Sequence, residues 1–273
     1  MNTVGQYLSS AQSYSRNDPL RAAAIATGAV VIPLLVLAYN DYNYYCSMGP
    51  HGMPNNFWGW KRQLSLAPKA RKDTTVPAPY DQAEAARGFG PKSTESFFNR
   101  PLEARAGPRP EVCSFVAPQR QMTERCTEAM KRAMNAYLDR LVLENSDLLQ
   151  RENSLLEGPV PAVQVKKGVT TPECLKKTRG ELIHVHPPDG STHLVLSLPD
   201  SARVIEQGWE QRHRLSGGPL LQWGYTLLYA PRNEEEFALW KEVVAAATRF
   251  TTSTVGKVKI PSPAESVTRK GRE

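Results

Sequence analysis

The chain has 273 residues, and its 22 prolines and weakly patterned middle favour one compact unit with appendages over two full domains. A formal charge of +7 comes from 34 basic and 27 acidic residues spread along the chain, without a basic stripe interleaved with aromatic residues. A nucleic-acid partner is therefore not expected. The cysteines form no CxxC pair, so we interpret them as free thiols or core residues. One disulfide is an alternative only if the domain lies in an oxidising lumen.

An uncharged apolar stretch covers residues 22–39. At about 1.5 Å of rise per residue, it nearly crosses a hydrocarbon core of about 30 Å. The stretch runs into a tyrosine-rich segment instead of a small-residue cleavage site, which favours a retained single-pass anchor over a signal peptide. Arg16 and Arg21 precede it, so the amino terminus is expected in the cytosol. We expect a location in the endoplasmic reticulum or another endomembrane.

After the anchor, residues 41–117 are rich in proline and show no sustained period, which is typical of a wrapping or linking segment. From position 122 to 143, apolar residues recur at spacings of three and four, which predicts an amphipathic helix. Its apolar stripe contains Met122, Cys126, Met130, Met134, Tyr137, Leu138 and Leu141.

Short runs rich in β-branched, leucine and aromatic residues follow and predict strands: AVQVKK, GELIHVH, STHLVLSL and WGYTLLYA. A short helix over 201–207, with Asp200 or Ser201 as its cap and Gly208 as its stop, and a longer one over 234–250, capped by Asn233, interrupt or follow them. The order β-β-β-α-β-α predicts an α+β fold with a small antiparallel sheet and a few packed helices.

The predicted organisation is an amino-terminal tail (1–19), the anchor (20–40), the proline-rich segment (41–117), the α+β domain (118–256) and a basic flexible tail (257–273).

Histidines concentrate in one predicted hairpin. Side chains alternate along a strand, so His184 and His186 share a face while Ile183 and Val185 point to the other. A turn centred on positions 188–190 would pair His186 with His193, bringing three imidazoles together.

Three interpretations remain open for this cluster. His-x-His on one strand with a third histidine on its neighbour suits a zinc or iron site formed by His184, His186 and His193. Alternatively, the imidazoles act as a general base and hydrogen-bond donors around an enol or acyl substrate. The third interpretation is a structural one, with histidines held in the fold or exposed on a strand.

A second group of chemically capable residues lies in GWEQRHRLSGG, residues 208–218, which we expect to be a loop. In it, Trp209 could stack on a flat ring, Arg212 could hold an anion, and His213 could complete the imidazole set, with Gln211 beside them. Further along, Tyr229 and Arg232 end a strand beside a helix amino terminus, where anions also bind.

At these residues the sequence resembles the fungal luciferases, which oxidise 3-hydroxyhispidin with molecular oxygen. The resemblance covers RGELIHVH, THLVLSL, GWEQRHRL and LLYAPRNEEE in order. It extends upstream to the anchor, to Asp41-Tyr42, to Gly49-Pro50 and to the NFWG stretch at 56–59.

The resemblance implies an oxygenase-type enzyme that needs no cofactor besides O2, although a metal remains open. Its substrate would be 3-hydroxyhispidin or a related enol or pyrone, with light emission when the product forms in an excited state. We assign His184 or His186 as the base, His193 and His213 as its partners, and Arg212 and Arg232 as anion ligands. Trp209, Gln211 and Tyr229 are assigned to substrate binding.

Two alternatives of other classes are kept. One is a membrane-tethered protein that binds a phenolic or apolar ligand without turnover. The other is a metal-dependent enzyme that uses the three histidines. No P-loop, GxGxxG, GxSxG or HExxH pattern occurs, so nucleotide-driven and serine-hydrolase chemistry are not expected.

Overall fold

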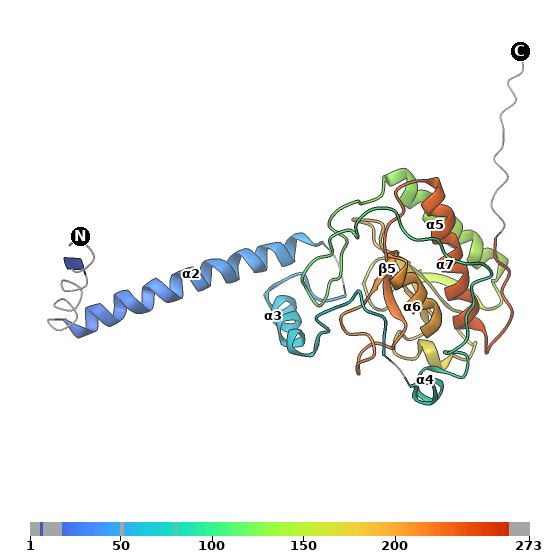
Figure 1. The fold of residues 1–273 in the computed structure, drawn as a ribbon, viewed down its shortest axis with the longest axis horizontal. Coiled ribbons are helices and arrows are strands. Elements are labelled where there is room, and N and C mark those ends of the chain that lie inside the picture. Colours follow the sequence, from blue (N-terminus) through green and yellow to red (C-terminus); the bar gives the residue numbers. More distant parts are fainter. Residues whose placement is uncertain (1–5, 8–17, 50–51, 80, 262–273) are drawn as a thin grey trace, which may run out of the picture. The chain divides into compact units, whose positions relative to one another are not determined.

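A computed structural model of the chain describes residues 6–7, 18–49, 52–79 and 81–261 (Figure 1). The chain forms two units, Met1–Met48 and Gly49–Glu273. Most of the predicted amino-terminal tail and most of the predicted basic tail lie outside the described residues.

The first unit contains helix α2, Pro19–Ser47, which is longer than the predicted span. Asp18 caps it by accepting a hydrogen bond from the Arg21 backbone N–H at 3.2 Å, and Pro33 lies inside it. Its most apolar stretch has a mean hydropathy of 2.2. The helix is therefore long and apolar enough to cross a membrane, a test that a signal sequence would also pass.

The second unit is built on a six-stranded antiparallel sheet with the order β1-β2-β3-β4-β6-β5. Its strands are β1 (Leu149–Asn153), β2 (Pro161–Val165), β3 (Glu181–Val185), β4 (Thr192–Val195), β5 (Glu210–Arg212) and β6 (Tyr225–Leu228). The predicted α+β class and antiparallel sheet are confirmed.

Two of these strands were not predicted. β1 has the polar sequence LQREN and pairs only with β2, so neither apolar content nor alternation marks it. β5 lies in the segment expected to be a loop. It has three residues and forms by pairing with β6, a long-range contact that local sequence does not encode.

One face of the sheet is covered by α5 (Glu128–Glu144) and α7 (Glu234–Thr252), which lie side by side (Figure 1). The rings of Tyr137 and Trp240 meet between the two helices at 6.0 Å. The core beneath them contains Val163, Val165, Ile183, Val185, Leu194 and Leu228, which alternation places on this face.

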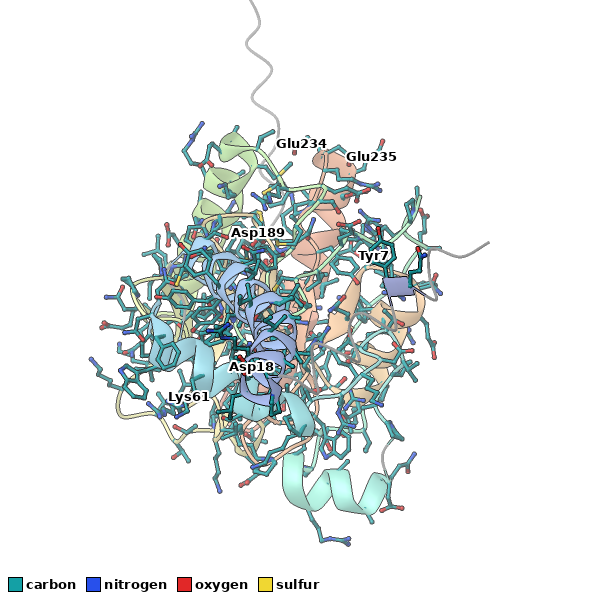
Figure 2. The ribbon with its side chains drawn as sticks, turned by 90° about the vertical axis from the view of Figure 1, so that its left-hand side faces the viewer. Tyr7, Asp18, Lys61, Asp189, Glu234 and Glu235 are labelled. Carbon is teal, nitrogen blue, oxygen red and sulfur yellow. The ribbon has the colours of Figure 1, made fainter. Side chains whose placement is uncertain are left out.

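Helix ends follow local capping chemistry. Asn233 caps α7 as predicted, accepting from the Glu236 N–H at 2.9 Å, and Glu234 and Glu235 lie at this amino-terminal end (Figure 2). The prediction for α5 was wrong at its start, because Thr127 caps it and Met122 lies before it, next to the isolated β-bridge between Val112 and Gln121.

Helix α6 (Leu198–Glu206) also begins earlier than predicted, with Ser197 at its cap position. The carboxylate of Asp200 accepts instead from Ser96 and from the Phe97 N–H. The predicted stop at Gly208 is confirmed by its positive φ of 84°.

The proline-rich region contains α3 (Phe57–Leu66), η1 (Ala67–Lys69) and α4 (Gln82–Phe89), and η2 (Glu173–Leu175) precedes β3. Extended parts of this region form backbone hydrogen bonds with the edge strand β5 and the residues that follow it. The Arg212 N–H donates to Thr74 O at 2.8 Å, and the Arg71 N–H donates to Arg214 O at 2.9 Å. These residues are therefore part of the second unit's packing.

Candidate functional site: a buried histidine cluster

The histidine hairpin forms, but its register differs from the predicted one. His184 pairs with His193, and the predicted pairing of His186 with His193 is wrong. The turn is tighter than expected, because the His186 N–H donates to Ser191 O at 2.8 Å and closes the loop two residues earlier than the predicted pairing would. A shift of two residues preserves the face of every side chain, so the three imidazoles still lie on one side of the sheet.

The three rings contact one another on the sheet face opposite α5 and α7. Ring centroids lie 5.2 Å apart for His184 and His186, 5.3 Å for His184 and His193, and 4.8 Å for His186 and His193. His213 follows β5 and joins the cluster at 5.4 Å from His193. All four side chains are buried, none more than 5% exposed.

Each hairpin histidine has its Nδ1 atom engaged at the edge of the cluster. His184 Nδ1 lies 2.5 Å from the Glu181 carboxylate, and His186 Nδ1 lies 2.8 Å from Ser191 Oγ, which itself hydrogen-bonds to Asp189. His193 Nδ1 donates to the Thr226 carbonyl at 2.8 Å. These partners hold the proton at Nδ1 and leave the Nε2 lone pairs directed away from them.

His213 has the opposite tautomer. Its Nδ1 accepts a hydrogen bond from the Leu215 N–H at 3.1 Å, so a neutral His213 carries its proton on Nε2. His213 is therefore a hydrogen-bond donor in this cluster, whereas the other three are acceptors at Nε2.

Sequence reasoning missed two residues of this cluster, Glu157 and Arg120. Glu157 Oε1 lies 3.8 Å from His186 Nε2 and 4.0 Å from His184 Nε2. Its other oxygen accepts from the buried Arg120 guanidinium at 2.6 Å. Both residues lie in irregular segments with no periodic pattern, so no sequence signal marks them.

Glu181 was missed for a different reason. Strict alternation would place it on the opposite face from His184, three positions later. A register irregularity between β2 and β3 pairs Ile183 with Val163 but Glu181 with Gln164, which reverses the alternation. Glu181 thereby reaches the histidine face, where Ser154 Oγ and the Leu155 N–H donate to its carboxylate.

Burial controls the protonation of the cluster. Desolvation lowers the pKa of His186 and His193 well below their ordinary value, with Arg120 and the neighbouring imidazoles adding to the effect. Burial likewise lowers the pKa of His213 to about 4, although Glu157 opposes it. These three imidazoles are therefore neutral near pH 7.

Tyr225 adds an aromatic wall to the cluster. Its ring stacks on His193 with centroids 4.8 Å apart and an interplanar angle of 21°. Burial raises the pKa of its hydroxyl well above the ordinary value, so the group remains protonated.

The structure does not bring the two predicted anion-binding arginines to the histidines. Arg212 alternates with Gln211 in β5, on the other face of the sheet, where it bonds to Ser216 and lies over Trp223. Arg232 is ion-paired with Glu236 and Glu124. The guanidinium that lies beside the cluster is that of Arg120.

The predicted substrate-binding residues lie together where β5 begins and its antiparallel neighbour β6 ends. The Tyr229 hydroxyl donates to Gln211 Oε1 at 3.1 Å, and the Tyr229 N–H donates to Trp209 O. The Trp209 indole donates to Glu103 O at 2.6 Å and is 7% exposed, so it is packed rather than open to a ligand.

A groove of about 490 Å³ lies on the other side of the molecule, along α7. Apolar side chains and a few charged ones line it, among them Phe98, Arg100, Tyr137, Ala238, Ala245 and Ile260. It shares no residue with the histidine cluster.

The fold and the cluster together define a class: an antiparallel α+β domain in which the sheet face opposite α5 and α7 carries a cluster of buried imidazoles. The family model described as the luciferase domain matches residues 179–247, which span all four clustered histidines. The chain is therefore similar to the fungal luciferases, in this domain and in the residues around it.

The relatives extend this match over most of the chain. The luciferase of Armillaria gallica is 29% identical over 259 residues, covering 90% of this chain and 93% of that protein. The luciferase of Neonothopanus nambi is 27% identical over 262 residues, covering 89% and 91%. No solved structure matches this chain.

Proposed function

We propose that this protein is an oxygenase of the luciferase type, which acts with O2 on 3-hydroxyhispidin or a related enolic pyrone and needs no flavin or nicotinamide. The observation that carries the proposal is the set of neutral imidazoles at the centre of a water-poor cluster. An enol is a weak acid, and a base with a free lone pair is what its activation requires.

The tautomers determine which histidines can accept a proton and which can donate one. His184, His186 and His193 present Nε2 lone pairs, so one of them takes the enol proton. His213, with its proton on Nε2, donates to the developing enolate oxygen. The electron-rich enolate then reacts with O2, and the surrounding burial excludes water that would compete for the intermediate.

Substrate entry requires some of the residues that bury the cluster to move, because all four histidines are buried. These residues include Arg120, which bonds to Glu157, and its neighbour Gln119, which donates to Arg212 O at 3.2 Å. Both residues belong to an irregular segment, which is the kind of element that admits ligands in enzymes with closed sites.

The test is oxygen uptake and photon emission when detergent-solubilised protein is mixed with 3-hydroxyhispidin. His184→Ala should lower the rate by about 100-fold or more, because general bases contribute about 10²- to 10⁴-fold. Ala238→Arg, which fills the groove along α7, serves as the control and should retain turnover. Absence of oxygen uptake by the unmodified protein would overturn the proposal for this substrate.

A non-catalytic binder of a phenolic or apolar ligand is the second candidate, and the groove along α7 favours it. Its volume and its mixture of apolar and charged lining suit a small aromatic ligand. In that case the same pair of variants would behave in the reverse manner: ligand affinity would fall with Ala238→Arg and would not change with His184→Ala.

A further inference from the structure

The four side chains at the centre of the cluster have the composition and spacing of a metal site. His184, His186, His193 and Glu157 each offer one ligand atom, and these atoms all lie within 4.8 Å of one another. All four residues are buried: His184 lies in β3, His186 directly follows it, His193 lies in β4, and Glu157 lies between β1 and β2. The geometry points to a site for one divalent transition-metal ion held by these three imidazoles and one carboxylate.

The hydrogen bonds around the imidazoles prepare them as ligands. A metal-binding histidine normally donates its second ring N–H to a carboxylate, carbonyl or hydroxyl oxygen, which fixes the tautomer and the ring. Here His184 has Glu181, His186 has Ser191, and His193 has Thr226 O as that partner. Each Nε2 is thereby left as the coordinating atom, and an imidazole that binds the metal cannot at the same time take the enol proton, so this site goes beyond the base proposed above.

The central nitrogens lack other partners. His184 Nε2 and His186 Nε2 are buried, and neither has a hydrogen-bond partner among the described residues. Buried acceptors without a donor destabilise the fold. Their convergence with a carboxylate oxygen at 3.8 and 4.0 Å adds electrostatic repulsion, which a cation at the centre would convert into attraction.

A water molecule satisfies this arrangement less well than a metal ion. Water has two protons, so it can donate to only two of the four acceptors. A dication binds all four, and the Glu157 and Glu181 carboxylates together balance its charge, while Arg120 holds the second oxygen of Glu157. Arg120 and Glu181 are therefore positioning residues in this proposal.

The donor set also selects the kind of ion. Imidazole nitrogens with one carboxylate and no thiolate suit Zn²⁺, Fe²⁺, Mn²⁺ or Co²⁺ better than Mg²⁺ or Ca²⁺, which prefer oxygen ligands. Bonds of about 2.0–2.2 Å place two ligand atoms at most about 4.4 Å apart. A tetrahedral arrangement places them about 3.5 Å apart, so the most widely separated ligand atoms would approach each other by roughly 1 Å on binding.

The experiment measures metal binding, and its result does not depend on the proposed oxygenase activity. Full-length protein, purified in detergent without a histidine tag, is analysed for metals, stripped with a chelator, and titrated with Zn²⁺, Mn²⁺, Co²⁺ and, without oxygen, Fe²⁺. The expected results are one ion per chain, a visible Co²⁺ absorption band typical of nitrogen and oxygen ligands, and a rise in Tm with added metal.

Two variants locate the site. His186→Ala should weaken binding by about 100-fold or more and remove the Co²⁺ band, because it deletes a direct ligand. His213→Ala should retain one ion per chain, because its Nδ1 already accepts from the Leu215 N–H and it lies outside the ligand set. Loss of metal from His213→Ala but not from His186→Ala would overturn the assignment.

If the His186→Ala protein does not fold, the unmodified protein still decides. Substoichiometric metal, no Co²⁺ band and an unchanged Tm would refute the metal site. If metal-stripped protein consumes oxygen with 3-hydroxyhispidin, the proposed oxygenase activity stands and does not need the metal. If metal-loaded protein shows no turnover, the metal site stands and the proposed oxygenase activity is refuted for this substrate.

Discussion

At the scale of single residues, Glu210 shows how burial alone sets a charge state. It lies in β5 on the face opposite the histidines and is fully buried. Its carboxyl group bonds to Thr226 Oγ1 at 3.0 Å and also to Ser201. Burial raises the pKa of Glu210 well above its ordinary value, and these hydrogen bonds only partly oppose the effect.

A stability prediction follows from this pKa. The folded protein keeps the Glu210 proton at pH values where the unfolded chain has lost it, so its contribution is fully present below the ordinary pKa and declines as pH rises toward the folded value. The decline reaches about 1.4 kcal/mol per pH unit. Glu210→Gln, which stays neutral, should therefore raise Tm at pH 8 and do so much less at pH 5. Thermal unfolding followed by circular dichroism checks this, and an equal shift at both pH values would contradict it.

Single residues also show where sequence reasoning succeeds. Alternation placed His184, His186 and His193 on one face, and even a wrong register left that result intact. Glu157 and Arg120 could not be found this way, because only the tertiary fold brings their irregular segments to the sheet. Arg212 was misplaced because its segment was taken as a loop, in which alternation does not apply.

At the scale of elements, the β3–β4 hairpin depends on a crowded glycine in its turn. Gly190 has a φ of +83°, and a Cβ built there would lie 2.1 Å from Cys126 Sγ. The neighbouring Asp189 O accepts from the Cys126 N–H at 3.2 Å, so the turn is fixed on both sides. Only glycine fits this combination of backbone conformation and close approach.

Replacement of this glycine should disturb the hairpin and the hydrogen bond that orients His186. Gly190→Ala is compared with Gly168→Ala, whose φ is +95° but whose Cβ would meet nothing within 4 Å. The control should lose about 1 kcal/mol from backbone strain alone. Gly190→Ala should lose about 2 kcal/mol or more beyond that, because Cys126 must move. Urea unfolding measures both, and equal losses would show that crowding is unimportant.

Elements were predictable to the extent that their own sequence carries the signal. The strands of the hairpin, β6 and the cap of α7 follow from apolar content and capping residues. The start of α5 could not be predicted from apolar spacing, because Met122 and Cys126 continue that spacing although Thr127 caps the helix. A local hydrogen bond outweighs hydrophobic periodicity at that end.

At the scale of the whole molecule, α2 forms a unit of its own, and we expect it to anchor the protein in a membrane as a retained span. Full-length protein should remain in the membrane fraction after alkaline carbonate washing, because transfer of this helix into water would expose its apolar surface. A chain without residues 1–48 should appear in the soluble fraction. Amino-terminal sequencing that finds cleavage after the helix would identify a signal peptide instead.

The cover of the sheet has a consequence for how the protein is made. Arg71 Nε donates to Ser216 O at 2.8 Å across 145 positions of sequence. At about 5–20 residues per second, the ribosome needs roughly 7 to 30 s to synthesise that interval. During this time the proline-rich region exists without the strands it must pack on. Nascent chains are therefore most exposed to chaperones and proteases in this region, and a premature stop codon before β5 leaves it permanently without its partner.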